Sequence, residues 1–321
     1  MKTIITLASL LIGVLQSQAV EWPDGQITFH VTDESGKSLD DIPVDTVVFD
    51  ESKPPATYKV ITSTTDIQGL AVVNTPNITK EYSYTVKNVA GYYSSGGLYK
   101  FDSSTNGQWL PWNPTVNIVL KPIGARVPMY AKKVWNTSLP ENNKQIGYDL
   151  EIGDWVAPYG KGITSDFIFT LQRQFTNVTQ YFDATLTLSF PNDGDGIQSV
   201  MSDSSGSLFR IPRSAPTNDY EPKLVLQMYR EDGKPMVGVS ANPDQNYFFR
   251  VRTKKDDRGN IVSAMYGKIY GGVGWDIFHS TTAKLRFTYY LNSEPNSRNM
   301  GFVAKQNLFK NLPSFERVTA P

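Results

Sequence analysis

Hydrophobic and polar residues alternate along most of the chain. Residues 26–32 (QITFHVT) show this period of two, and the turn residues at 33–37 (DESGK) follow them. Such alternation is typical of a strand with one buried face, and a turn cluster directly after it indicates a hairpin. The same pattern predicts further strands at residues 44–49, 58–62, 70–73, 82–86 and 115–120. Because no amphipathic helix separates them, this part predicts a small, prealbumin-like or immunoglobulin-like antiparallel sandwich.

The second part of the chain, from about residue 127 to 315, continues in the same way. Hairpin turns are expected at Asp232-Gly233 and Arg258-Gly259-Asn260. Strands are predicted at residues 167–171, 184–190, 223–229, 247–253, 263–270 and 284–291. The pattern indicates an all-β chain whose second domain is a larger sandwich or jelly roll of about eight to twelve strands. Pro122-Ile123-Gly124 marks the boundary, so we expect domains at residues 20–123 and 124–321.

The first residues predict export. Lys2 supplies a positive start, residues 4–15 form a short apolar run, and Ser17-Gln18-Ala19 resembles a cleavage site. We therefore expect residues 1–19 to be a secretory signal peptide. No later stretch approaches the roughly 18 apolar residues of a membrane-spanning helix.

The amino-acid composition excludes thiol chemistry and argues against binding to nucleic acid. The chain has no cysteine, so it forms no disulfide and offers no thiolate for catalysis or metal binding. A large exported chain without disulfides favours a bacterial envelope, with a secreted or periplasmic location. The 31 basic residues balance the 31 acidic residues, which argues against nucleic acid as a partner.

Residues 25–121 resemble a known domain family. The order of VTDESGKSL, TDIQGLA, YSYTVK and the closing VNIVL is similar to carboxypeptidase regulatory-like, prealbumin-like domains, although the insertion at 94–113 departs from that pattern. The resemblance implies an accessory sandwich without catalytic residues. Residues 146–169, 190–196 and 247–271 are similar to exported bacterial proteins of no established function, so they imply no activity.

Three acids in residues 147–155 (GYDLEIGDW) are candidate catalytic residues: Asp149, Glu151 and Asp154. In an extended segment, Asp149 and Glu151 would share one face about 7 Å apart, a spacing that suits glycoside hydrolysis. The same alternation is typical of any half-buried strand. We favour a solvent-facing acidic edge, backed by Leu150 and Ile152 in the core.

Histidine chemistry has little support. The two histidines, His30 and His279, lie in different predicted domains, and no nucleophile motif accompanies either. A zinc enzyme with two or three histidine ligands is therefore not expected.

Two surfaces are candidate ligand-binding sites. Trp109 and Trp112 lie in the inserted loop, where indole rings stack on sugars or lock the loop in place, and we favour packing. In the hairpin at 246–270, period-two alternation puts basic and aromatic residues on one face, suited to an anionic glycan or simply solvated. These residues are Arg250, Arg252, Tyr266, Lys268 and Tyr270.

Asp193 and Asp195, in the segment DGDG, are candidate calcium ligands. Pro191 and Ser202 occupy positions where an EF-hand needs carboxylates, so the loop is not an EF-hand. We favour a plain β-turn rich in Asp and Gly as the interpretation of this segment.

These observations leave three functions open. The first is an exported, non-catalytic binding or adhesion module for carbohydrate at the bacterial envelope. The second is a carbohydrate-active enzyme that uses Asp149, Glu151 or Asp154. The third is a purely structural envelope protein. The first hypothesis is favoured because residues for catalysis are few and aromatic residues are many.

Overall fold

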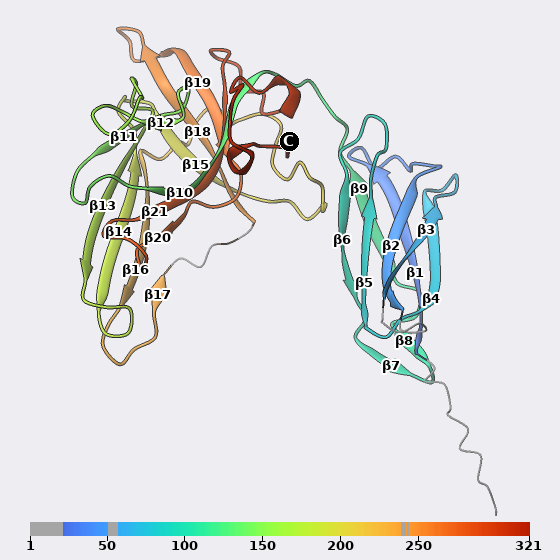
Figure 1. Ribbon diagram of the computed structural model, residues 1–321. Helices are drawn as coiled ribbons and strands as arrows, with labels where there is room; N and C mark the ends of the chain where they lie inside the picture. Colours follow the sequence, from blue (N-terminus) through green and yellow to red (C-terminus); the bar gives the residue numbers. More distant parts are fainter. Residues whose placement is uncertain (1–21, 51–56, 239–241, 243) are drawn as a thin grey trace, which may run out of the picture. The chain divides into compact units, whose positions relative to one another are not determined.

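A computed structural model describes residues 22–50, 57–238, 242 and 244–321 (Figure 1). The expected signal peptide lies outside the described residues. Strands dominate the described part of the chain, and its helices are two short 3-10 turns, η1 (Ala304–Gln306) and η2 (Ser314–Glu316). The all-β class predicted from the sequence is therefore confirmed. No helix in the described residues is long and apolar enough to cross a membrane.

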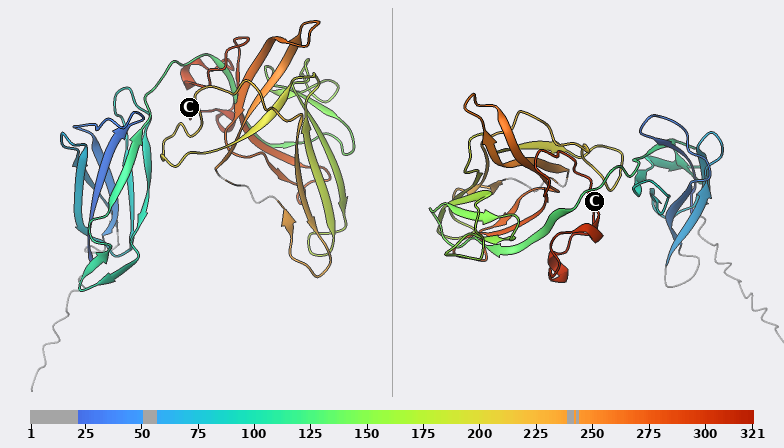
Figure 2. Two further views of the ribbon diagram at one scale, coloured as in Figure 1. Left: turned by 180° about the vertical axis from the view of Figure 1, so that it is seen from behind. Right: turned by 90° about the horizontal axis from the view of Figure 1, so that it is seen from above.

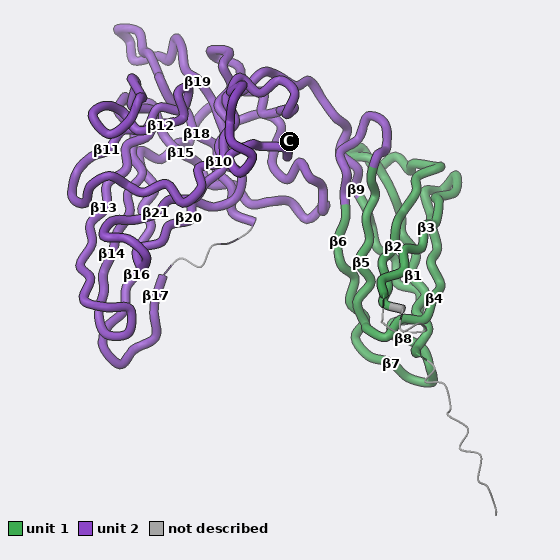
Figure 3. Tube along the Cα trace, in the orientation of Figure 1, with its two compact units in different colours: residues 1–87, 96–118 green, residues 88–95, 119–321 purple. Residues whose placement is uncertain are grey.

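The chain divides into two compact units (Figure 3). Unit 1 contains residues Met1–Lys87 and Gly96–Ile118, and unit 2 contains Asn88–Ser95 and Val119–Pro321. The division differs from the boundary expected at residues 123–124, because residues 88–95 and 119–123 belong to unit 2.

Unit 1 is a β-sandwich of two sheets. The five-stranded sheet contains β1 (Asp24–Asp33), β4 (Leu70–Pro76), β7 (Ser103–Thr105), β8 (Gln108–Leu110) and β9 (Thr115–Leu120). The four-stranded sheet contains β2 (Pro43–Asp50), β3 (Thr57–Thr64), β5 (Glu81–Val86) and β6 (Ser95–Lys100). The strands predicted here are all present, and the inserted segment at 94–113 supplies three more.

The apolar positions of β1 hold the two sheets of unit 1 together. Ile27, Phe29 and Val31 are fully buried, and the ring of Phe29 lies 5.1 Å from that of Tyr84 in the opposite sheet. The period of two in residues 26–32 therefore marks the core face, as expected.

Unit 2 is a larger sandwich of twelve described strands in two six-stranded sheets (Figures 1 and 2). The first sheet, sheet D, contains β10 (Met129–Ser138), β15 (Gly196–Met201), β18 (Gln245–Lys255), β19 (Ile261–Ile269), β20 (Gly274–Asp276) and β21 (Lys284–Asn292). The second, sheet E, contains β11 (Ile146–Asp149), β12 (Asp154–Trp155), β13 (Phe167–Phe175), β14 (Phe182–Ser189), β16 (Lys223–Arg230) and β17 (Val237–Gly238). The predicted strands are again present.

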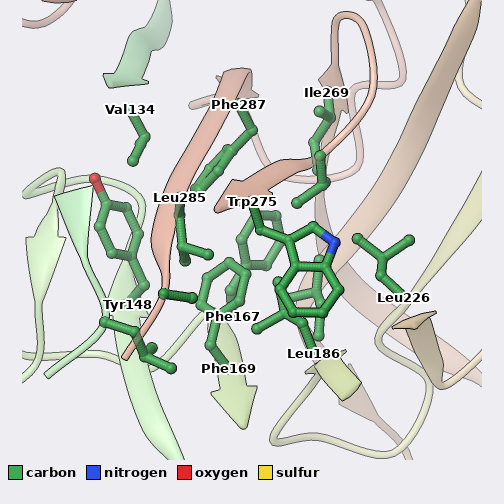
Figure 4. Packing of buried hydrophobic residues seen from close by; sticks show 14 of the residues in the cluster. Val134, Tyr148, Phe167, Phe169, Leu186, Leu226, Ile269, Trp275, Leu285 and Phe287 are labelled. Atoms are coloured by element: carbon green, nitrogen blue, oxygen red, sulfur yellow. The ribbon is translucent and has the colours of Figure 1, made fainter. Parts of the chain in front are cut away.

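Aromatic side chains fill the core between the two sheets of unit 2 (Figure 4). Phe167 and Phe169 of sheet E meet Phe287 of sheet D at ring distances of 6.3 and 5.8 Å. Phe249 lies over Gly267, its partner on the neighbouring strand. A Cβ atom at Gly267 would come within 2.1 Å of the Phe249 ring, so the glycine is needed for this packing.

A second apolar cluster covers the other face of sheet D. Phe248 and Tyr266 point away from the main core and contact Phe209, Ile211 and Met300 from irregular segments. Strands β18 and β19 are consequently buried on both faces along most of their length. Antiparallel sheets commonly leave one face in water, and the β18–β19 part of sheet D does not.

Tyr93 and Lys121 explain why residues 88–95 and 119–123 belong to unit 2. The ring of Tyr93 stacks on Phe209 at 5.1 Å and 14°, and Lys121 forms an ion pair with Asp203. The two segments also pair with each other, since the N–H of Tyr93 donates to the carbonyl of Lys121 at 2.9 Å.

We expect calorimetry of the mature chain to show that Tyr93→Ala destabilises unit 2 and leaves unit 1 unchanged. Removing a buried ring costs about 3 kcal/mol, and the lost contact is with Phe209. Phe29→Ala is the matched variant and should lower only the transition of unit 1. A Tyr93→Ala variant that lowers the unit 1 transition would contradict the division.

Candidate functional site

Asp149 ends strand β11 and is buried. Its Oδ1 accepts the backbone N–H groups of Glu151 and Ile152 at 3.0 and 3.1 Å. Its Oδ2 accepts those of Ile163 and Thr164, both at 2.9 Å. Burial raises the pKa of Asp149, but these four donors outweigh it and hold the pKa below its ordinary value. The carboxylate therefore stabilises a backbone turn.

The structure corrects the expectation for residues 148–152. Strand β11 ends at Asp149, and residues 150–153 form the turn of a hairpin with β12, in which Gly153 has φ +71°. Asp149 and Glu151 therefore do not share a solvent-facing strand edge. Leu150 is in the core as expected, whereas Ile152 is 45% exposed.

Arg252 of β18 joins the acids of sheet E. Its Nε and Nη2 donate to the two carboxylate oxygens of Asp166 at 2.7 and 2.9 Å, a bidentate geometry. Its Nη1 lies 2.6 Å from Glu151 Oε2, and its Nη2 lies 3.5 Å from Asp149 Oδ1. Burial raises the pKa of Asp166, and Arg252 opposes that rise. We call Asp149, Glu151, Asp166 and Arg252 the arginine–acid cluster.

A break in strand pairing directs Arg252 toward this cluster. The register between β18 and β19 shifts between Val251 and Lys254, and Arg252 has φ +55°, a left-handed conformation that costs energy outside glycine. Period-two alternation had grouped Arg252 with Arg250. The irregularity separates them, because Arg250 instead donates to the carbonyls of Gly194 and Thr217 at 2.6 and 2.8 Å.

Asp154, the third candidate acid, is also held by the backbone. Its Oδ1 accepts the N–H of Trp155 at 2.8 Å, and its Oδ2 accepts that of Lys161 at 3.0 Å. The carboxylates of Asp149, Asp154 and Glu151 are thus all engaged within the protein. General acid or base catalysis needs a carboxyl group that can exchange a proton with a substrate.

Arg250, Tyr266 and Lys268 share a face of the β18–β19 hairpin, as expected, whereas Arg252 does not. Arg250 pairs with Tyr266 across the strands, and Phe248 pairs with Lys268. This face is covered, however, and Arg250, Tyr266 and Lys268 are 7%, 7% and 0% exposed. The exposed stripe expected from the sequence is therefore wrong, because the second apolar cluster lies over it.

Lys268 is enclosed by aromatic rings. Its Nζ donates to the carbonyl of Met300 at 2.9 Å and lies 4.7 and 4.5 Å from the rings of Phe209 and Tyr290. Burial lowers the pKa of Lys268 to about 7. Tyr270, at the edge, accepts a hydrogen bond from Arg210 at 2.8 Å.

The two tryptophans of the inserted loop differ. Trp109 is partly buried in β8 and donates its indole N–H to the carbonyl of Asn77 at 3.0 Å. Trp112 is 38% exposed. The packing role that we favoured thus has a direct contact for Trp109.

The Asp-Gly loop engages protein partners. Asp195 is buried and accepts the N–H of Thr253 at 2.8 Å and the amide of Asn192 at 2.7 Å. Asp193 is 92% exposed and pairs with Lys255 at 2.6 Å. Among the described residues, no group of three or more histidine or acidic side chains could hold a metal ion. A calcium site at this loop stays a prediction.

The histidines lie in separate units. His30 in β1 is near the hydroxyl of Ser38 at 3.4 Å, and the exposed His279 contacts Asp276 at 2.8 Å. Neither lies in a described Ser-His-Asp arrangement.

Sequence reasoning did not identify a hollow of about 380 Å³ on the outward face of sheet E. Its lining is polar and comes from Asn143, Gln172, Arg173, Gln174, Asp183 and Thr185. In residues 167–175 and 182–189 the apolar residues face inward, and threonine and glutamine are frequent at the outward-facing positions between them. These polar positions are the signal in the sequence that could have indicated the hollow.

Comparisons with known proteins assign no family and no function to the chain. No family model matches the chain, and no curated protein matches it. A streptococcal ancillary pilin aligns at 12% identity over 82% of this chain and 58% of the pilin, with a TM-score of 0.22. BcpA, the major pilin subunit of Bacillus cereus, aligns at 10% identity over 82% of this chain and 95% of its own, also with a TM-score of 0.22. With such low TM-scores, neither similarity assigns a function to this chain.

We expect Asp149→Asn to destabilise unit 2 by about 3 kcal/mol. The amide replaces one acceptor oxygen by a donor, which leaves buried N–H groups unsatisfied. Glu151→Gln is the matched variant and should cost less than about 1 kcal/mol, since this side chain is partly exposed. Urea unfolding measures both. Equal costs for the two changes would contradict the structural role of Asp149.

Lys268 should make stability depend on pH. Its folded pKa is about 7, whereas an unfolded lysine titrates near 10.4, so the unfolded chain binds more protons between these values. Stability should therefore rise with pH from about 7 toward 10, by up to about 1.4 kcal/mol per pH unit. The full cost of burying the charged Lys268 is present below pH 7.

Lys268→Met is the variant that isolates this effect. Methionine fills similar space without a charge, so the rise of stability between pH 7 and 9.5 should disappear. The chain has no cysteine, so no thiol titrates in that pH range. Urea unfolding at each pH measures the free energy of unfolding of both proteins. If this free energy rises with pH as steeply in Lys268→Met as in the parent, Lys268 remains charged in the folded protein.

Proposed function

We propose that the protein is an exported, non-catalytic binding or adhesion module of a bacterial envelope, with carbohydrate as its ligand class. Unit 1 would serve as an accessory sandwich of the carboxypeptidase regulatory-like, prealbumin-like type. Export rests on the sequence of residues 1–19, which has the three parts of a secretory signal.

The observation that carries the non-catalytic part is the state of the candidate acids. Asp149 accepts four backbone N–H groups, Asp154 accepts two, and Glu151 pairs with Arg252. A glycosidase needs one acid that donates a proton and a second carboxylate that attacks or activates water. The hydrogen bonds to Asp149 hold its pKa below the ordinary value, so it is a poor proton donor, and the four backbone N–H groups occupy the oxygens with which it would attack or activate water.

Carbohydrate is favoured over other ligands by charge and by surface chemistry. The chain has equal numbers of acidic and basic residues. On the β18–β19 hairpin Arg250 and Lys268 are buried. The exposed Lys254, Lys255 and Arg258 flank Asp256 and Asp257 in the sequence, so the hairpin presents no purely basic stripe to an anionic polymer. Tyrosine, glutamine and threonine side chains on exposed strand faces suit an uncharged, hydroxyl-rich ligand.

We expect the mature chain to be retained on immobilised polysaccharide without releasing reducing ends. Retention should change little between low and physiological salt, because exposed charges contribute little to it. The measurement compares bound protein and soluble sugar over a panel of chitin, cellulose, xylan and peptidoglycan.

Two outcomes would contradict the proposal. Reducing ends that appear with the parent and disappear in a folded Asp149→Asn/Glu151→Gln variant would identify a glycosidase. No retention on any polysaccharide would favour a purely structural protein.

A further inference from the structure

Two rungs of exposed and half-buried side chains cross the outward face of sheet E. Gln172 of β13, Thr185 of β14 and Gln227 of β16 are register partners in the first rung. Gln174, Asp183 and Tyr229 occupy the same strands in the second. We call these six residues the amide–hydroxyl panel. Their neighbours along each strand point into the core, so the panel faces away from it.

The panel is not a flat solvated surface. The hollow of about 380 Å³ is lined by the β13 and β14 members of both rungs and by Asn143, and Gln227 and Tyr229 of β16 lie next to it in the register of the sheet. Small-molecule sites begin at about 300 Å³, so the hollow is large enough for part of a ligand chain. A sheet face that is merely wet needs no such depression.

The polar groups of the panel are available to a ligand. The side chains of Gln172 and Thr185 make no hydrogen bond to the part of the protein that the structure describes. Gln227 Nε2 lies 3.5 Å from Asp183 Oδ1, and Gln174 Oε1 lies 3.4 Å from the hydroxyl of Tyr181, which are both weak contacts. An amide both donates and accepts hydrogen bonds, and so does each hydroxyl of a sugar.

The charge of the panel selects against ionic polymers. Asp183 is its one carboxylate, which repels phosphate, sulfate and uronate groups. The cation in the lining, Arg173, donates to the carbonyls of Thr281 and Ile277 at 3.0 and 2.9 Å and lies over the ring of Phe175. It is therefore committed to the fold and is not directed at an anion.

Two tyrosines add apolar surface at one end of the panel. Tyr229 is the β16 member of the second rung and is 37% exposed, and Tyr181 beside Gln174 is 40% exposed. Aromatic faces contact the C–H side of a sugar ring, while the amides contact its hydroxyls. The combination matches both sides of a pyranose.

We propose that the amide–hydroxyl panel binds an uncharged polysaccharide, whose chain lies across β13, β14 and β16 with its sugar hydroxyls on Gln172 and Gln227. This inference rests on the proposed function, because it names the ligand class and the surface for the same activity. It places binding away from Trp109, Trp112 and the buried residues of the β18–β19 hairpin.

The test is electrophoresis of the mature chain in native gels that contain one soluble polysaccharide each. Hydroxyethylcellulose, glucomannan and arabinoxylan are the uncharged probes, and polygalacturonate is the charged one. We expect retardation by at least one uncharged probe. Gln172→Ala/Gln227→Ala should weaken that binding about tenfold, since two pairs of hydrogen bonds are lost.

Gln306→Ala is the matched control, because it removes an exposed amide from η1 in the same unit. It should leave retardation and the melting temperature unchanged. The double variant should also melt like the parent, since both of its side chains are exposed.

The outcomes separate this inference from the proposed function. Retardation that survives the double change would reject the panel and leave the proposed function standing. Retardation by polygalacturonate alone would reject the uncharged ligand class. The absence of retardation by all four polymers would reject this inference, whereas the proposed function would be overturned only if the immobilised polysaccharides also failed to retain the protein.

Discussion

Strands β18 and β19 have to bury side chains on both faces, and much of unit 2 follows from that constraint. One face contributes Phe249 and Val251 to the main core, and the other contributes Phe248 and Tyr266 to the second cluster. A polar group inside such a sheet needs a partner, because its desolvation is otherwise uncompensated. Arg250 therefore donates to two backbone carbonyls.

The arginine–acid cluster follows the same rule at the edge of the main core. Arg252 neutralises Asp166, which is fully buried, and it also reaches Glu151. A buried ion pair contributes little net stability compared with apolar packing, but the loss of one partner is costly. The cluster is best understood as a fixed join between sheets D and E, and its acids are held there and are not free for chemistry.

The strands could be predicted well from the sequence, but the segments that pack over their faces could not. Alternation reports which residues share a face, so the pairing of Arg250 with Tyr266 could be anticipated. It does not report what lies over that face, because Phe209 and Met300 come from irregular segments far away in the chain. The irregularity before Lys254 was equally invisible, and it reversed the expected direction of Arg252. The candidate site on sheet E was missed because a polar outward face is the ordinary pattern of a strand.

The position of Tyr93 has a consequence for the order in which the protein is made. Its ring packs on Phe209 in a cluster that also includes Met300, whereas the described part of unit 1 ends at Ile118. A chain that emerges from its N-terminus can therefore complete unit 1 while residues 88–95 still lack their partners. The ring of Tyr93 stays without Phe209 until more than two hundred of the 321 residues have been synthesised, so this joining segment is packed long after the unit 1 strands that precede it in the chain.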